Sequence, residues 1–327
     1  MPEGGEAGGA KPFFDGGIIL HSKLLFVAAS WGLAWVAGRE LATSMPEAIV
    51  AWYRYAMAIP LFFIWLYFNE RGGREGKTAL FIPRGEMFWK IAWIGFFSTF
   101  LYQLLFMYGM ARTAAGDASV IITFNPVFTA LLAIPLLNRR ISATLVFGLL
   151  VGLFGVIIVT GWSPNNDIPL NVRLVGDLLI MCAAASWAVS TILMKKILED
   201  ENSDDETPSA LAIITWASLL GWVLLTPLAT FDFIAHGRDS IPNLSGWLWI
   251  FYLAVASTVL SYAWFAEGIN KIGPTATATY VYLVPFFGIL SGFLLLGESV
   301  GWSLFAGLVL ILIGVQISLY ASNEYER

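Results

Sequence analysis

Apolar residues in this chain gather into ten segments of about 20 residues, the length that a helix needs to cross a lipid bilayer. The segments cover residues 22–42, 47–68, 88–111, 115–137, 142–161, 174–196, 208–230, 246–270, 274–296 and 301–321. Polar connections between them are short, apart from residues 69–87 and two loops near residues 198–207 and 232–245. No connection is long enough to hold a soluble domain. The pattern predicts an all-α membrane protein with ten transmembrane helices.

The composition agrees with a membrane protein and excludes several other classes. Hydrophobic residues make up 58% of the 327 residues and charged residues only 13%, against about 25% in a typical soluble domain. One cysteine, Cys182, and two histidines, His21 and His236, exclude a disulfide framework and argue against a metal centre. No basic stripe indicates binding to nucleic acid. We therefore expect no metal, no cofactor and no nucleic-acid partner.

Lysine and arginine positions predict the orientation, because cytoplasmic loops carry an excess of both. With a cytoplasmic N-terminus, thirteen basic residues fall inside: Lys11, Lys23, Arg71, Arg74, Lys77, Arg84, Lys90, Arg139, Arg140, Lys195, Lys196, Lys271 and Arg327. Four fall outside, namely Arg39, Arg112, Arg173 and Arg238, while Arg54 lies within the second segment. Both termini are therefore expected in the cytoplasm. The acidic run from Glu199 to Glu206 is then a solvated cytoplasmic loop.

The second half of the chain repeats the first at an interval of 159 residues. This interval aligns Pro126 with Pro285, Phe128 with Phe287, Leu136 with Leu295, Gly148 with Gly307, Gly155 with Gly314 and Val156 with Val315. Because each half has an odd number of segments, the halves are expected to cross the membrane in opposite senses. The predicted organisation is a flexible N-terminal tail (1–21), a first five-helix repeat (22–161), a second five-helix repeat (162–321) and a C-terminal tail (322–327). Inverted repeats are typical of secondary transporters, whose substrate site lies between the repeats.

A proline lies near the middle of the fourth and of the ninth segment, at Pro126 and Pro285. A proline inside a helix removes a hydrogen bond from the carbonyl four residues earlier, here that of Ile122 or Val281. An unpaired carbonyl costs several kcal/mol in hydrocarbon, so such breaks are tolerated where protein or a watery cavity covers them. Matching breaks in two halves point to a midplane binding site, although packing alone explains either proline taken singly. We predict a helix break or hinge at each.

A few polar and aromatic side chains within the segments are candidates for substrate contact. Arg54 lies about 12 Å inside Pro46, and an intramembrane guanidinium can bind a carboxylate through two hydrogen bonds. Pairing of Arg54 with Glu40 or with helix-end carbonyls is an equally good explanation. Gln103 and Asn125 carry amides, which need partners in a membrane core. Aromatic rings expected to face the centre offer flat surfaces and a few donors, with plain packing as the alternative: Trp31, Tyr102, Trp187, Trp264, Tyr280 and Tyr282.

Other charged and small residues are expected to be structural. Glu267 and Lys271 are four residues apart and form a helix-surface pair. Asp117 opens the fourth segment, where its charge suits a helix N-terminus. Glu298 follows the ninth segment and is expected to be a terminal or loop residue. A face for close helix packing is formed by Gly148, Gly152 and Gly155 and is echoed by Gly307 and Gly314.

Several of these residues resemble the drug/metabolite transporter superfamily, EamA type. The resemblance rests on Trp31–Gly32, Arg54, Ala184–Ala185–Ser186–Trp187, Gly273–Pro274–Thr275–Ala276, Tyr282–Leu283–Val284–Pro285–Phe286–Phe287, Leu296–Gly297–Glu298, Gly307 and Gly314–Val315. It implies ten helices in two inverted halves and alternating-access transport of small metabolites, usually outward, across a bacterial inner membrane. The aromatic richness resembles the YddG-type aromatic amino-acid exporters. In the first half this chain has Asn138–Arg139 where the family has Gly–Glu, which leaves the role of that glutamate open there.

The leading hypothesis is export of small amphipathic metabolites, above all amino acids with aromatic or hydrophobic side chains, by a multi-pass plasma-membrane protein. No Asp, Glu or His falls in the middle third of any predicted segment, which favours a facilitator or exchanger over an obligate proton antiporter. A carrier of other organic solutes or drugs is the alternative within the same fold. A membrane enzyme lacks a catalytic constellation, and a sensor or scaffold lacks a docking domain. A monomer is expected, and a dimer is left open.

Overall fold

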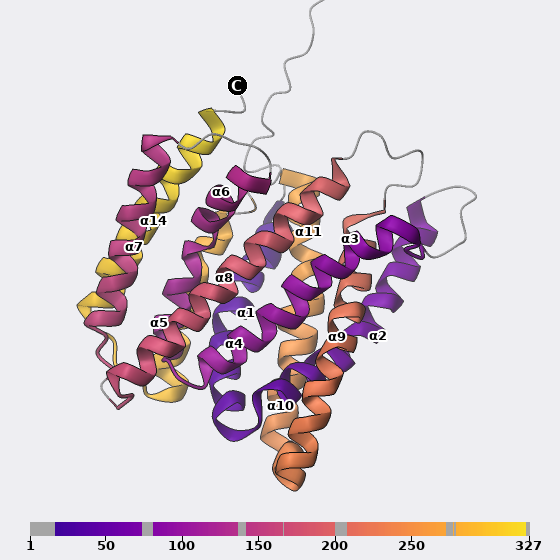
Figure 1. Cartoon of the computed structure of the whole chain (residues 1–327), viewed down its shortest axis with the longest axis horizontal. Helices are drawn as coiled ribbons and strands as arrows, with labels where there is room; N and C mark the ends of the chain where they lie inside the picture. The colour runs from indigo at the N-terminus through magenta and orange to yellow at the C-terminus, as the bar shows by residue number, and fades with distance from the viewer. Residues whose placement is uncertain are drawn as a thin grey trace, which may run out of the picture.

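The protein is built from long helices that run side by side (Figure 1). The computed structural model describes residues 17–73, 81–136, 142–165, 167–199, 208–272, 277 and 279–324. In the first half the elements are α1 (Gly17–Ser44), α2 (Glu47–Gly73), α3 (Gly85–Gly95), η2 (Phe96–Leu101), α4 (Tyr102–Met110), α5 (Ala115–Ile121), η3 (Ile122–Phe124), α6 (Asn125–Leu136) and α7 (Ala143–Gly161). In the second half they are α8 (Leu170–Leu198), α9 (Ala210–His236), η4 (Gly237–Ser240), α10 (Leu244–Ala254), η5 (Val255–Leu260), α11 (Ser261–Ile272), η6 (Thr279–Leu283), α13 (Val284–Ser291), η7 (Gly292–Leu296) and α14 (Trp302–Glu324).

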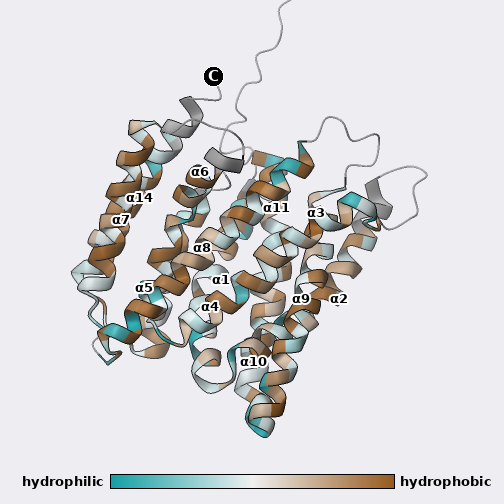
Figure 2. Cartoon of the chain, viewed as in Figure 1, coloured by the Kyte–Doolittle hydropathy of each residue, from teal (hydrophilic) through white to brown (hydrophobic). Residues whose placement is uncertain are grey.

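Most of these helices are apolar enough to lie in a bilayer. Seven described helical stretches are long enough to cross it: Gly17–Ser44, Glu47–Phe68, Gly85–Met110, Ala143–Gly161, Leu170–Leu198, Ala210–Ser240 and Leu244–Ile269. Two shorter apolar stretches are Tyr280–Leu296 and Trp302–Ser318. Figure 2 shows hydrophobic residues along much of α7 and α14, and the exposed side chains of α7 include Phe147, Leu150, Phe154 and Ile157. Their spacing of three or four residues places them on one outward face, as contact with lipid requires. An all-helical membrane protein is thus confirmed for the described residues.

Both proline-bearing segments are interrupted by 3₁₀ turns. Residues 115–136 divide into α5, η3 and α6, and residues 279–291 begin with η6 before α13. Pro126 and Pro285 each occupy the second position of the helix that follows, where a missing N–H leaves no helical hydrogen bond unmade. The Ile122 carbonyl, expected to lack a partner, accepts the backbone N–H of Asn125. The tight turn therefore satisfies a group that a continuous α-helix would leave unpaired.

Helices α7 and α14 lie against each other along one edge of the bundle (Figure 1). A Cβ atom at Gly155 would lie 2.8 Å from the Gly307 carbonyl oxygen, and one at Gly314 would lie 2.6 Å from the Gly148 carbonyl oxygen. Such distances leave no room for a side chain, so the two backbones approach as small residues permit in membrane interfaces. The predicted close-packing face of glycines is confirmed, and it joins the fifth apolar segment to the tenth.

Contacts between the two halves of the chain occur in matched pairs. Helix α2 packs against α9 and α7 against α14, and in both cases the partners hold equivalent places in the two halves. Helix α3 contacts α9 while α10 contacts α2, and α4 contacts α8 while α11 contacts α1. Helix α6 contacts α8 while α13 contacts α1. Each of these contacts is therefore repeated by the counterpart elements of the other half.

Two π-helical turns also lie at equivalent places. Turn η2 separates α3 from α4, and turn η5 separates α10 from α11. Their bounds are offset by 159 residues, from 96 to 255 and from 101 to 260, which is the interval of the sequence repeat. Because π turns are rare and occur frequently at functional sites, the space between η2 and η5 is a candidate functional site.

Candidate functional site

Arg54 is buried within a hydrogen-bond network that joins the two halves. Its Nε and Nη2 donate to Thr258 Oγ1 at 3.1 and 2.9 Å, and its Nη1 donates to Gln103 Oε1 at 3.2 Å. Gln103 Nε2 donates in turn to the Tyr55 hydroxyl at 3.2 Å. The described partners of Arg54 are therefore side chains of α4 and η5, and not Glu40 or helix-end carbonyls. The residue links α2 to both π-bearing helices.

The Arg54 charge is not balanced by a carboxylate in the part of the chain that the structure describes. Arg54 is 9% exposed, while Gln103 and Thr258 are each 1% exposed. A buried cation without a counter-ion is costly, and neutral acceptors offset only part of that cost. The site is therefore one in which a substrate carboxylate would find a charge-assisted partner.

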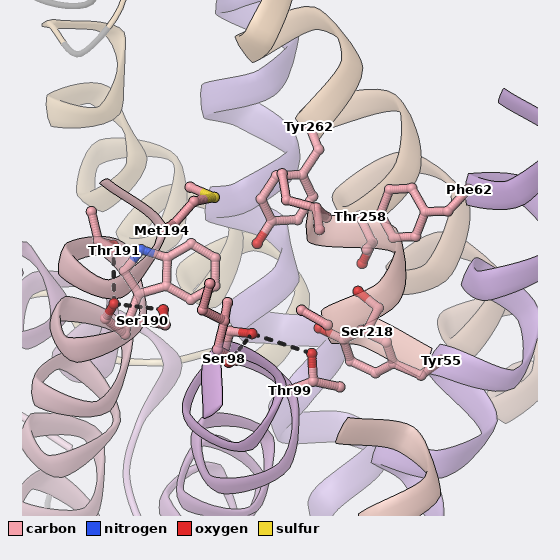
Figure 3. Close-up of a pocket in the computed structure, with 14 residues that line it drawn as sticks. Tyr55, Phe62, Ser98, Thr99, Ser190, Thr191, Met194, Ser218, Thr258 and Tyr262 are labelled. Atoms are coloured by element: carbon pink, nitrogen blue, oxygen red, sulfur yellow. Dashed lines mark hydrogen bonds between the residues drawn. The ribbon is translucent and has the colours of Figure 1, made fainter. Parts of the chain in front are cut away.

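A cavity lies beside this network, between α2, the π turns, α8, α9 and α11 (Figure 3). Its volume of about 60 Å³ is room for about four water molecules. Residues with hydroxyl groups dominate its polar lining: Tyr55, Ser98, Thr99, Ser190, Thr191, Ser218, Thr258 and Tyr262. The lining residues include no acidic or basic side chain. The space is too small for a metabolite as it stands, so helices must move apart to admit one.

Aromatic rings form a connected cluster around the cavity. The Trp187 ring centroid lies 5.3 Å from that of Tyr102 and 6.1 Å from that of Tyr262. Tyr262 also lies 6.1 Å from Trp31, whose indole N–H donates to a backbone carbonyl of η5 at 3.0 Å. These separations are typical of favourable ring pairs. The cluster offers flat apolar faces next to the buried charge.

Five residues predicted to contact substrate lie in this network and cluster: Trp31, Arg54, Tyr102, Gln103 and Trp187. Asn125 is half-buried at the start of α6, where its Oδ1 accepts from Thr129 Oγ1 at 3.4 Å. The Tyr282 hydroxyl accepts from Gln316 Nε2 at 3.4 Å. Of these seven residues Trp187 lines the cavity, and the lining does not include Trp31, Arg54, Tyr102, Gln103, Asn125 or Tyr282.

Trp264 and Tyr280 belong to a second polar cluster, at the end of the bundle where α1 begins. Lys23 Nζ pairs with Glu267 Oε2 at 2.7 Å and lies 5.9 Å from the centre of the Trp264 ring. His21 Nδ1 and the Tyr280 hydroxyl are 2.5 Å apart. Because α1 belongs to the first half while α11 and η6 belong to the second, both contacts bridge the halves. The predicted orientation places this cluster on the cytoplasmic side.

Replacing Lys23 with methionine is expected to weaken this bridge and to change the transport rate. Glu267 pairs on its other side with Lys271 at 2.8 Å, within one helix. A partly exposed ion pair contributes about 0.2–1 kcal/mol, so the melting temperature of the solubilised protein should fall by only about 1–3 °C. Lys271→Met removes the other partner of the same carboxylate and is the matched control, with little expected effect on transport. Equal transport rates in both variants would show that the bridge between halves has no role in the cycle.

Glu298 makes a further contact between the halves, near the other end of α1. Its Oε1 and Oε2 accept the backbone N–H groups of Ala115 and Gly116 at 2.6 and 2.8 Å. These donors open α5, whose N-cap residue Ala114 has no side-chain acceptor, so Glu298 caps the helix from outside. Burial raises the pKa of Glu298, and the two backbone hydrogen bonds act against that rise. Glu298 is a loop residue as predicted, with a capping role that spacing alone did not reveal.

Buried polar groups surround the start of α5. Asp117 lies in the first turn of that helix, as predicted, and is fully buried. Asp177 on α8 is also buried and accepts from Thr113 Oγ1 at 2.5 Å. Neither carboxyl group is in the cavity lining, and the contact of Asp177 with Thr113 joins the two halves.

Sequence reasoning predicted one residue of the cavity lining, Trp187, and missed the others, among them Tyr55, Thr258 and Tyr262. A signal for Thr258 existed, since the interval of 159 residues also aligns Ser98–Thr99 with Ser257–Thr258. Extending the repeat into the third and eighth segments would have found both dipeptides.

Comparison with known proteins identifies the family. The sequence matches the EamA-like transporter family over residues 18–161 and 174–320. A probable amino-acid metabolite efflux pump of Escherichia coli (strain K12) is 26% identical over 304 residues, with 90% of this chain and 93% of that protein covered. The uncharacterized transporter YetK of Bacillus subtilis (strain 168) is 23% identical over 295 residues, covering 90% of this chain and 84% of its own length.

A known crystal structure supports the fold. It aligns with a TM-score of 0.56 at 16% sequence identity, covering 93% of this chain and 98% of its own. At that identity the likeness concerns the fold alone. The family match, by contrast, covers nearly the whole chain, and the family consists of transporters rather than enzymes. This multi-pass membrane protein therefore belongs to the EamA-like transporter family.

Proposed function

We propose that the protein exports small amphipathic metabolites, above all amino acids with aromatic or hydrophobic side chains, through the cavity beside Arg54. The observation that carries this proposal is a buried guanidinium with no described carboxylate partner, next to a cavity ringed by aromatic side chains. The charge suits a substrate carboxylate, and the rings suit an apolar side chain. Relatives named as probable amino-acid metabolite efflux pumps agree with this choice of substrate.

Hydrogen bonds through Gln103 and Tyr55 connect Arg54 to the cavity. Because the Tyr55 hydroxyl accepts from Gln103, its own proton is available to a substrate in the cavity, which Tyr55 lines. A carboxylate would accept from Tyr55 and draw the guanidinium towards itself. The donor pole is this end of the cavity, formed by Tyr55 with Gln103 and Arg54 behind it.

Alternating access supplies the movement that the small cavity requires. We infer ten transmembrane helices in two inverted five-helix repeats, with both termini in the cytoplasm of a bacterial cell. Rocking of the repeats about the breaks at Pro126 and Pro285 would widen the cavity towards each side in turn. Facilitated diffusion or exchange is favoured over obligate proton antiport, and transport that stops when the pH gradient is collapsed would contradict this.

Counterflow in proteoliposomes tests the function directly. Vesicles preloaded with unlabelled phenylalanine, tryptophan or leucine are expected to accumulate the labelled amino acid transiently. Trp187→Ala should lower the initial rate by about tenfold, because a ring that lines the cavity is lost. Trp162→Ala, at the exposed end of α7, should transport at the wild-type rate. If no amino acid and no other small metabolite accumulated transiently, the proposed function would be contradicted.

A further inference from the structure

The two π turns carry the same pair of residues at the same positions, and the threonine of each pair lines the cavity. Ser98–Thr99 occupies the third and fourth positions of η2, and Ser257–Thr258 occupies the same positions of η5. Thr99 is 2% exposed and Thr258 is 1% exposed, and both line the cavity (Figure 3). The repeat therefore presents two equivalent hydroxyl groups to one enclosed space.

The two hydroxyl groups differ in how far they are already engaged. Thr258 Oγ1 donates to the Leu253 carbonyl at 2.7 Å and accepts two N–H groups from Arg54. Thr99 faces α9 instead, where a Cβ atom at Gly221 would lie 2.5 Å from the Thr99 Cβ. Within the described residues, the polar contact of the Thr99 hydroxyl is Ser98 Oγ at 3.5 Å. The first-half hydroxyl thus lacks the charged partner that its counterpart has.

Neighbouring hydroxyl groups leave their lone pairs available to the cavity. Ser98 donates to the Ile94 carbonyl at 2.8 Å. Ser190 and Thr191 both donate to the Trp187 carbonyl, at 2.7 and 3.0 Å. A hydroxyl that gives its proton to the backbone still accepts hydrogen bonds. These residues therefore make the lining rich in acceptors, and the lining contains no acidic or basic side chain.

We propose that the hydroxyl wall, formed by Ser98, Thr99, Ser190 and Thr191, binds the hydrogen-bond donor of a monocarboxylate substrate. The donor is an ammonium or hydroxyl group, and the carboxylate lies at the donor pole beside Tyr55 and Arg54. The inference rests on the proposed function and adds a second pole to the same site. It selects α-amino and α-hydroxy acids over carboxylates without a donor, because the latter leave the acceptors of the wall unpaired on binding.

Three probes that differ in one substituent test the wall. L-phenylalanine carries an ammonium at Cα, L-3-phenyllactate a hydroxyl, and 3-phenylpropionate only hydrogen. Binding to the purified full-length protein in detergent is followed by quenching of tryptophan fluorescence, since Trp187 lines the cavity. In the double variant Ser98→Ala/Thr99→Val, the Kd for the first two probes is expected to rise about tenfold, while the Kd for 3-phenylpropionate changes less than about twofold.

Two further variants separate recognition from damage to the fold. Thr99→Ser keeps the hydroxyl and is expected to bind all three probes as the wild type does. Thr215→Val makes the same chemical change on α9 at a buried threonine outside the cavity lining, whose hydroxyl donates to the Leu211 carbonyl at 2.8 Å. It should leave all three Kd values unchanged. Melting temperatures of every variant provide the check on folding.

The Kd values of the three probes distinguish failure of the hydroxyl wall from failure of the proposed function. Selective weakening of both donor-bearing probes, or of L-phenylalanine alone, supports the wall, and the second result assigns it to an ammonium. Equal weakening of all three probes, or no weakening of any, overturns the wall and leaves the proposed function standing. Failure of the folded wild-type protein to bind any of the probes overturns the proposed function and the wall together.

Discussion

Replacing Arg54 with methionine is expected to lower the initial rate of counterflow by about 100-fold while the protein still inserts into the membrane. The substitution removes the buried charge that we propose attracts the substrate carboxylate. It also leaves Gln103 Oε1 and Thr258 Oγ1 without the donors that now lie 2.9–3.2 Å away. Loss of one partner from a buried, hydrogen-bonded charge pair typically costs 2–5 kcal/mol, which is the size of effect that this rate requires. Rates are normalised to the amount of folded protein in the vesicles.

Two other substitutions show whether the charge or its geometry matters. Arg54→Lys keeps a positive charge but loses the planar fork that reaches Thr258 and Gln103 at once, so an intermediate rate is expected. Arg84→Met removes an exposed arginine at the N-cap of α3 and should leave transport unchanged. Wild-type transport by Arg54→Met would mean that the guanidinium only ties helices together.

Replacing Gly314 with alanine is expected to destabilise the protein by about 1–3 kcal/mol, the usual cost of overpacking a tight interface. The added methyl group would lie 2.5 Å from the Gly152 backbone nitrogen and 2.6 Å from the Gly148 carbonyl oxygen. Both obstacles are backbone atoms of α7, so no side-chain rotation relieves the clash. Thermal unfolding of the solubilised protein should shift downward by about 3–10 °C.

Gly161 provides the matched control for this substitution. It lies at the end of α7, and a Cβ atom built there meets nothing within 4 Å. Gly161→Ala should leave the melting temperature unchanged or raise it slightly, because alanine is the better helix former. Equal shifts in the two variants would show that contact between α7 and α14 contributes little to stability.

The sequence predicted the helices and the glycine interface well, because both depend on properties carried locally by the chain. Length and hydropathy define an apolar helix, and Gly148, Gly152 and Gly155 recur at the spacing of one helix face. The direction of individual side chains was harder to predict. Trp264 was expected at the centre, but it shares a face of α11 with Glu267 and Lys271, three and seven residues later, and its ring centre lies 5.9 Å from Lys23 Nζ.

Hydroxyl groups were overlooked for a different reason. Serine and threonine satisfy their own donors on the preceding turn, as Ser190 and Thr191 do on the Trp187 carbonyl, so a hydroxyl residue in an apolar segment does not by itself indicate a site. Only its recurrence in the repeat, as for Ser98–Thr99 and Ser257–Thr258, does so.

Gln103 was identified because a buried amide needs partners, which it finds on α2. The same reasoning selected Asn125, whose amide oxygen accepts from Thr129 within its own helix. The site was thus predictable where a side chain needs the rest of the fold.

The paired π turns have a mechanical consequence. Each holds about one residue more than an α turn, so a return to α geometry would shift everything downstream by one residue, roughly 100° of rotation and 1.5 Å of rise. Gln103 lies five residues after Ser98, and Tyr262 lies five residues after Ser257. The residue that accepts from Arg54 and the aromatic ring that lines the cavity therefore occupy equivalent positions after the two π turns. A change of η2 to α geometry would move Gln103 out of the site and leave Tyr262 in place, and the same change in η5 would do the reverse. The residues that such a shift would move in the two halves are set by the same spacing along the chain.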